Sequence, residues 1–189
     1  QQGEAGNRDW GVLVNDTDLA MTVLNHLSFD EGDQKSHITP VVAADAPSGW
    51  TMPTPGPIIG ELAPAIDGDF DATLLVCPDN CINELVTVLD EADEEILLSL
   101  QYLDMDWTYG WGENPIFEAL ENAAKRDVRL RLILNGAYLD EDIQNVADRF
   151  NEDWNFTQGY DASAIVMSGD DNVLKLHNKG IIVDGETVL

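Results

Sequence analysis

The sequence predicts an α/β fold, in which strands and helices alternate along the chain. After residue 72, short apolar runs alternate with amphipathic segments of about 10–15 residues, a pattern typical of a layered and mostly parallel sheet. Most of the prolines lie earlier, between Pro40 and Pro64, and predict a linker. We therefore expect a layered α-β-α sandwich with a mixed, largely parallel sheet beyond that linker.

The first 29 residues are predicted to hold one strand and one helix. Trp10–Val14 is a short apolar run of the kind found in buried strands. Thr17 or Asp18 is expected to cap the helix that follows, because a short side-chain oxygen can accept from the first free N–H groups. The apolar residues of this helix recur on one face: Leu19, Ala20, Val23, Leu24 and Leu27.

Regular elements resume at residue 72, where apolar runs predict strands and apolar positions three and four residues apart predict helices. Asn80 is expected to cap one helix and Asn114-Pro115 to begin another, since proline fits the first helical position. Asp184-Gly185 is typical of a hairpin turn. The expected strands are Thr73–Cys77, Glu95–Leu103, Val128–Leu134, Ala164–Met167 and Val173–Val183, with helices over Ile82–Leu89, Ile116–Ala124 and Leu139–Phe150.

The chain is strongly acidic, with 36 Asp and Glu against 9 Lys and Arg and a net charge of −27. Asp exceeds Glu and Lys is scarce, which suits a halophilic-like, salt-screened surface, although an ordinary acidic protein is the alternative. Such a surface repels nucleic acid and anionic membranes except near a local basic site. Most basic residues lie between Lys125 and Lys179, and no apolar run reaches the ~18 residues of a transmembrane segment.

The two cysteines, Cys77 and Cys81, leave two alternatives open. Two thiols do not complete a tetrahedral zinc site by themselves, so they form either a short disulfide or a pair of buried thiols. A disulfide implies an oxidising compartment. Together with the acidity and the Asn-x-Thr sequons at Asn15 and Asn155, it favours an extracellular or cell-surface location over the cytoplasm.

One stretch near the end of the chain carries the residues for phosphoryl chemistry. In a strand over Val173–Val183, side chains alternate, so His177 and Lys179 are expected on one face about 7 Å apart. An imidazole beside an ammonium provides a proton donor or nucleophile together with positive charge for phosphate oxygens. Asp184 follows at the end of the strand, where it can fix the turn.

This His-x-Lys-x-x-x-x-Asp spacing resembles the signature of the phospholipase D superfamily, as does the β-α-β-α-β order before it. The resemblance implies a metal-free and cofactor-free site in which His177 is the catalytic histidine, Lys179 binds phosphate and Asp184 orients or supports them. Relatives join two such motifs, from two repeats or from two copies of one. In two-repeat relatives one histidine forms a phosphohistidine and the second-repeat histidine protonates the leaving group, which would make His177 the general acid.

The resemblance also suggests three segments. Asn7–Val14 is similar to an element that follows the motif in each repeat. Residues 1–29 are thus expected to be the end of a preceding repeat, 30–71 a Pro/Gly/Asp-rich linker, and 72–189 a second repeat truncated just after its motif. Asp9 aligns with an acidic position that orients the histidine of its own repeat. The chain alone is then half a site, expected to be inactive unless a missing repeat or a second copy supplies the partner motif.

Two aromatic residues complete the candidate site. Trp107 and Trp111 follow a predicted buried strand, where open α/β sheets place ligands, and could shape a lip for substrate. Aromatics that cap the core are the competing interpretation. The function expected from the sequence is a phospholipase D-like phosphodiesterase or phosphatidyltransferase acting on a phospholipid or another phosphodiester. A nuclease of the same superfamily, disfavoured by the acidity, and a non-catalytic surface module are the alternatives.

Overall fold

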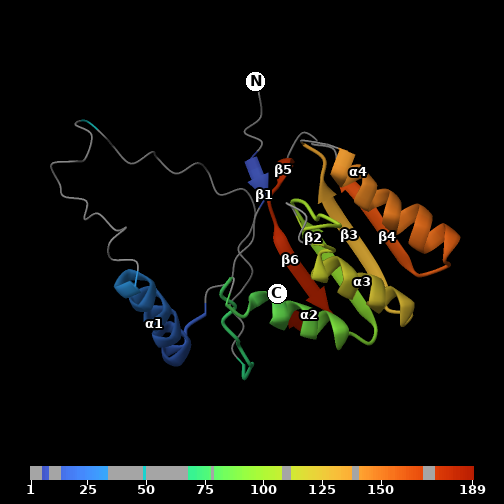
Figure 1. Ribbon diagram of the computed structural model, residues 1–189. Helices are drawn as coiled ribbons and strands as arrows, with labels where there is room; N and C mark the ends of the chain where they lie inside the picture. Colours follow the sequence, from blue (N-terminus) through green and yellow to red (C-terminus); the bar gives the residue numbers. More distant parts are fainter. Residues whose placement is uncertain are drawn as a thin grey trace. The chain divides into compact units, whose positions relative to one another are not determined.

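The computed structural model describes residues 6–8, 14–33, 49, 68–77, 79–107, 112–137, 141–167 and 173–189 (Figure 1). The chain divides into two compact units, one comprising Gln1–Leu13 and Leu75–Leu189 and the other Val14–Leu74. No helix of the described residues is both long and apolar enough to cross a membrane.

The larger unit is built on a mixed sheet of five strands in the order β4-β3-β2-β6-β7. Strands β2, β3 and β4 run parallel, whereas β6 is antiparallel to β2 and β7 is antiparallel to β6. A second, two-stranded sheet pairs β1 with β5 in parallel. This arrangement confirms the α/β class and the mixed, largely parallel sheet. The strands are β1 (Gly6–Arg8), β2 (Glu95–Leu100), β3 (Arg129–Asn135), β4 (Ala162–Met167), β5 (Val173–Leu176), β6 (Lys179–Val183) and β7 (Thr187–Val188).

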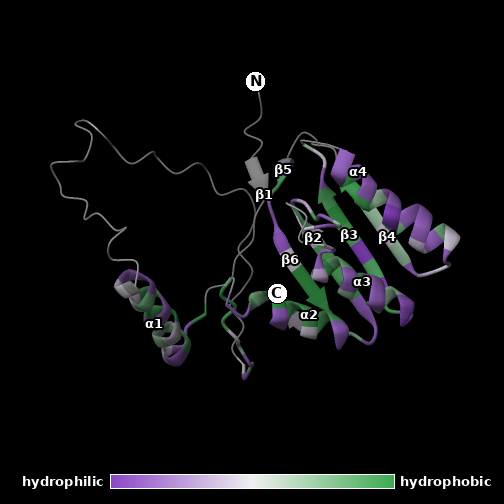
Figure 2. Ribbon diagram, viewed as in Figure 1, coloured by the Kyte–Doolittle hydropathy of each residue, from purple (hydrophilic) through white to green (hydrophobic). Residues whose placement is uncertain are grey.

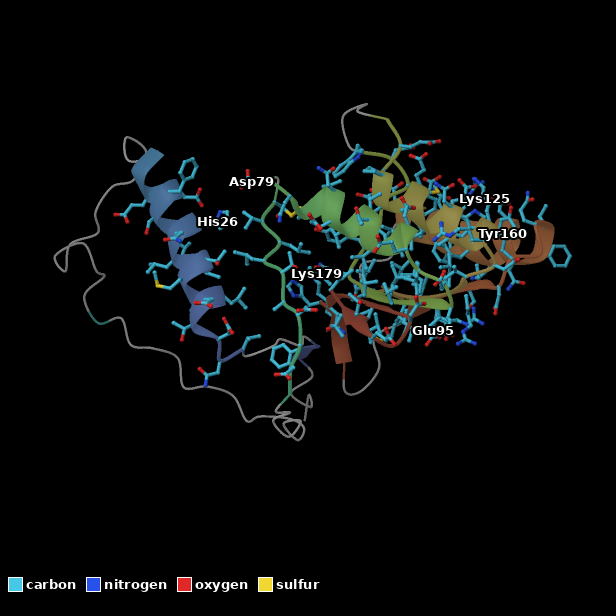
Figure 3. The ribbon with its side chains drawn as sticks, turned by 90° about the horizontal axis from the view of Figure 1, so that it is seen from below. His26, Asp79, Glu95, Lys125, Tyr160 and Lys179 are labelled. Atoms are coloured by element: carbon cyan, nitrogen blue, oxygen red, sulfur yellow. A yellow bond between two sulfur atoms is a disulfide. The ribbon has the colours of Figure 1, made fainter. Side chains whose placement is uncertain are left out.

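Helices α2 (Cys81–Asp90), α3 (Pro115–Lys125) and α4 (Glu141–Asp148) lie on one side of this sheet (Figure 3). Helix α3 begins as expected, because the Asn114 side chain accepts from Ile116 N–H at 3.0 Å and Pro115 occupies the first turn. Helix α4 continues as a π-helix, η2 (Arg149–Thr157). In Figure 2 the strands are mostly hydrophobic, whereas α3 and α4 carry hydrophilic residues on their outward sides.

The core lies between the sheet and these helices. The residues of β2 and β3 that point toward the helices are buried, as are Phe117, Phe150 and Trp154. The ring centroids of Phe150 and Trp154 are 4.5 Å apart, and those of Phe117 and Trp154 are 5.2 Å apart. Burial of side chains this large stabilises the fold by roughly 1.5–3 kcal/mol each.

The opposite face of the sheet carries exposed apolar side chains, including Ile133, Ile165 and Ile182. A shallow apolar depression of about 470 Å³ on this face is lined by residues of β2, β3, β6 and β7. The second helical layer of the expected α-β-α arrangement is not among the described elements of this unit. Arg129 and Arg131 lie on the same face and pair with Glu95 and Asp161, each at 2.6 Å.

The smaller unit contains the helix α1 (Thr17–Asp33), which confirms the helix expected there. Its cap is Asp16 rather than Thr17 or Asp18, because the helix begins at Thr17 and Asp16 Oδ1 accepts from Leu19 N–H at 2.7 Å. The helix ends at Asp33 and therefore extends past the expected boundary at residue 29. The strand expected at Trp10–Val14 falls mostly outside the described residues, and Val14 is not in a strand.

The strand expected at Thr73–Cys77 is wrong, because these residues pair with no other strand. The backbone groups of Val76 are used locally: its N–H donates to Asn80 Oδ1 and its carbonyl accepts from the Asn80 and Cys81 N–H groups. A disulfide between Cys77 and Cys81 closes the same turn. Of the two states left open by the sequence, the structure therefore has the disulfide.

Helix α3 ends in a turn that places Asp127 in the left-handed region, with φ +68°. Val128 N–H donates to Ala123 C=O and Asp127 N–H donates to Ala124 C=O, both at 3.1 Å. This is the Schellman arrangement, whose left-handed position favours glycine because a Cβ is strained there.

The turn between β6 and β7 is tied to the start of β2 by one side chain. Asp184 and Gly185 both have positive φ, as a tight hairpin turn of the expected kind requires. The Asp184 carboxylate accepts from the N–H groups of Asp93, Glu94 and Glu95 at 2.8–2.9 Å. These backbone hydrogen bonds hold the pKa of Asp184 below its ordinary value of 3.8.

We predict that Asp127→Gly raises the free energy of unfolding by about 1 kcal/mol, because it removes the strain of a Cβ at positive φ. Asp127→Ala removes the same charge but keeps a Cβ, so it is the matched control and is expected to bring no such gain. Urea denaturation of both variants, followed by circular dichroism, measures the difference. Equal stability of the two variants would contradict the prediction.

We predict that Asp184→Asn lowers the melting temperature at neutral pH, because a neutral amide binds the three N–H groups less strongly than a carboxylate does. A lowered folded-state pKa contributes stability that is fully present above pH about 4 and is lost as pH falls through that pKa. The gap between wild type and variant is therefore expected to close below pH 3.8. Thermal melts from pH 7 to pH 2 test this, with Asp90→Asn, an exposed residue of α2, as the charge-matched control.

Candidate active site

The segment with His177 and Lys179 lies where the chain passes from one sheet to the other. Strand β5 ends at Leu176 and pairs with β1, whereas β6 begins at Lys179 and pairs with β2. The prediction of a single strand over Val173–Val183 is therefore wrong. The first part of this segment hydrogen-bonds to β1 and the second part to β2, so the strand is interrupted between them. His177 and Asn178 form the break; His177 is half-buried, Asn178 is buried and Lys179 is exposed.

This break lies at the carboxyl ends of β2 and β3. In the antiparallel pair, Lys179 at the start of β6 faces Leu100 at the end of β2. The backbone of the next residue continues the contact, since Gln101 N–H donates to Asn178 C=O at 2.9 Å. The carboxyl ends of parallel strands are where open α/β sheets bind their ligands.

Polar side chains from β2 and β3 hold the break in place. Asn135, 2% exposed at the end of β3, accepts from Leu176 N–H through Oδ1 at 3.0 Å. Asn178 Nδ2 donates to Ser99 Oγ of β2 at 3.1 Å. Gly136 follows Asn135 so closely against β4 that a Cβ there would lie 2.5 Å from Met167 O. The residues on both sides of His177 are thus anchored to the sheet.

The ammonium of Lys179 is held by two uncharged oxygens. Its Nζ donates to Gln101 Oε1 at 2.9 Å and to the backbone carbonyl of His177 at 2.7 Å. Within the described residues, the ion pairs join carboxylates to four other cations, Lys125, Arg129, Arg131 and Arg149, and none involves Lys179. The charge of Lys179 is therefore not cancelled by a carboxylate of the described chain.

Asp184 lies at the other end of β6. Asp184 is five positions after Lys179, which in an extended strand corresponds to about 17 Å. Its three backbone hydrogen bonds are made to the start of β2, whereas Lys179 faces the end of that strand. The structure thus keeps Lys179 hydrogen-bonded to the His177 backbone at one edge of the sheet and places Asp184 at the opposite edge.

The other candidate residues are described only in part. Trp107 is 41% exposed and follows β2; its N–H donates to Gly112 C=O at 2.8 Å, which closes a loop next to the bridge between Asp106 and Glu113. Tyr102 lies beside Gln101 and is 60% exposed. Asp9 and Trp111 are outside the described residues. In the described parts of the chain, no three His, Cys, Asp or Glu side chains gather where they could hold a metal ion.

Sequence reasoning missed the residues that support the site. Asn135, Ser99 and Gln101 contact a segment that is 41, 79 and 78 residues away in the chain. The sequence did show polar residues at or just beyond the ends of apolar strands. This pattern indicates the edge of the sheet where a ligand binds, but not which residues these polar side chains contact.

One comparison with known proteins identifies a family. A family model described as "Cardiolipin synthase, PLD-like domain" matches residues 85–189, more than half of the chain. The match begins within α2 and includes His177, Lys179 and Asp184. A search of curated proteins finds no match. By this match the chain belongs to the phospholipase D-like family, within the phospholipase D superfamily.

Proposed function

We propose that this domain supplies one half of a phosphodiester-cleaving active site, in a phospholipase D-like phosphodiesterase or phosphatidyltransferase. The observation that carries the proposal is that His177 and Lys179 lie two residues apart at the carboxyl edge of the sheet, where the acceptors that the described residues give the Lys179 ammonium are uncharged oxygens. Family membership supports a phosphodiesterase-type function. The paired-histidine mechanism, the substrate and the residue roles belong to the proposal.

The mechanism requires a second motif, from another repeat or another copy of the chain. Lys179 binds a nonbridging phosphate oxygen and stabilises the charge that develops there. A histidine of the second motif attacks phosphorus and forms a phosphohistidine, while the bond to the leaving alcohol breaks. His177 acts as general acid and gives its proton to that oxygen. Water or another alcohol then attacks phosphorus, His177 takes up the proton of the attacking group, and the phosphorus–nitrogen bond breaks.

The remaining candidate residues receive different roles. We assign Asp184 a structural role, since its carboxylate binds the backbone at the start of β2 and not the residues near His177. Trp107, with Trp111, is proposed to border the substrate near the end of β2, and Asp9 to orient the histidine of its own repeat. A phospholipid is favoured over a nucleic acid as substrate, because a net charge of −27 opposes binding of a polyanion.

We predict that His177→Asn abolishes phosphodiester hydrolysis while the fold persists. The loss of the general acid is expected to lower kcat by about 10²–10⁴-fold. The assay measures release of choline from phosphatidylcholine, whose alcohol leaving group must be protonated, with the protein assembled so that two motifs meet. His26→Asn, on the exposed helix α1, is the matched control. Turnover that is unchanged in His177→Asn would refute the assignment.

We predict that the assembled enzyme cleaves phosphatidylcholine in vesicles faster than plasmid DNA at low salt. The acidic surface raises the cost of bringing DNA to Lys179, and that cost falls as salt screens the repulsion. Initial rates on both substrates between 50 mM and 1 M NaCl measure the preference. Faster cleavage of DNA at 50 mM NaCl would favour the nuclease instead, and binding without cleavage of either would favour a non-catalytic module.

A further inference from the structure

We infer that Gln101 is a positioning residue, which aims the Lys179 ammonium at the anion site without neutralising it. The inference deepens the proposed function, since it rests on Lys179 as the group that receives an anion. Neither the family match nor the sequence pattern assigns a role to Gln101.

Gln101 contacts the break between β5 and β6 and the adjacent Lys179 through both its backbone and its side chain. Its N–H donates to Asn178 C=O at 2.9 Å, which fixes the backbone of Gln101 beside the break. Its side-chain oxygen then accepts from Lys179 Nζ at 2.9 Å. The residue is half-buried at the end of β2, so its amide has less freedom than a fully exposed one.

An ammonium has three N–H donors, and two of those on Lys179 are taken by neutral oxygens of Gln101 and His177. Within the described residues the third donor has no recorded protein acceptor, so it can bind an oxygen of an incoming anion. Carbonyl and amide oxygens orient the ammonium through their dipoles but carry no net charge, so the attraction for an anion persists.

A carboxylate at residue 101 would reach the Lys179 ammonium equally well, but it would neutralise its charge. Glu has nearly the same shape as Gln, but its charge would pair with Lys179 and cancel the field that an anion meets. Acidic residues are abundant in this chain, and four other cations of the described residues are paired with carboxylates. The amide at residue 101 is therefore the feature that keeps Lys179 available.

Two nearly isosteric variants separate this role from simpler ones. If Gln101 only fills space, Gln101→Met should behave like wild type. If it only supplies an acceptor, Gln101→Glu should behave like wild type. The positioning role requires that both lose anion affinity, for different reasons: Met leaves Lys179 unheld and Glu neutralises it.

The experiment measures tungstate binding to the 189-residue chain by isothermal titration calorimetry at low salt, with thermal melts of every variant. We expect the Kd to rise about threefold or more in Gln101→Met and about tenfold or more in Gln101→Glu, tenfold being 1.4 kcal/mol. Gln158→Glu, an exposed site at the end of η2, adds the same charge elsewhere and is expected to leave the Kd unchanged. Lys179→Met is expected to abolish the tungstate binding that these variants modulate.

Steady-state assays of the assembled enzyme provide the readout that a purely structural role would not move. Gln101→Glu is expected to raise KM for the phosphodiester more than it lowers kcat, with an unchanged melting temperature. Wild-type affinity for tungstate in either Gln101 variant, or an equal loss in Gln158→Glu, would overturn the inference, as would a wild-type chain that binds no tungstate. If tungstate affinity ranks as expected but no phosphodiester is cleaved, the proposed function fails and the role of Gln101 stands.

Discussion

The antiparallel pairing of β6 with β2 is the constraint on which the candidate site depends. Because the two strands run in opposite directions, the first residue of β6 lies at the carboxyl end of β2 and the residue after β6 lies at its amino end. Lys179 therefore joins the edge where β2 and β3 end, and Asp184 joins the edge where β2 begins. A parallel β6 would exchange these two positions and separate Lys179 from Gln101.

The change of strand partner gives His177 its place. A residue inside a ladder has its backbone groups committed to the neighbouring strands, whereas His177 and Asn178 lie outside both strands and only the Asn178 C=O continues the pairing, with Gln101 N–H. Side chains from regular strands take the place of the missing ladder: Asn135 is buried at the end of β3, and Ser99 belongs to the central strand β2. The histidine thus sits on an irregular segment held at both ends by regular ones, an arrangement that suits a group that must be placed accurately.

Local patterns in the sequence were sufficient for the elements that depend on local forces. The cap at Asn114, the proline after it and the strand expected at Val128–Leu134 each follow from neighbours within a few residues, and the structure confirms them. The pattern failed where distant contacts decide. The sequence predicts one strand over Val173–Val183, but the first half of this segment pairs with β1 and its second half with β2. Val76 makes local turn hydrogen bonds that the apolar pattern does not predict. The motif located the edge of the candidate site, whereas Asn135, Ser99 and Gln101 required the fold, since each lies at least 41 residues from its partner.

The spacing between Lys179 and Asp184 has a physical explanation in this fold. Gly180–Val183 is the length of β6 that crosses the sheet beside β2, with Ile181 and Val183 buried against the helices. One residue more or fewer in this strand would turn every side chain to the other face, so that Lys179 and Asp184 could not both keep their partners. The aspartate fixes the register of β6 from one edge through three backbone N–H groups, and that register sets where the lysine emerges at the other edge. Asp184 can therefore influence where Lys179 lies, about 17 Å away along β6, without touching it.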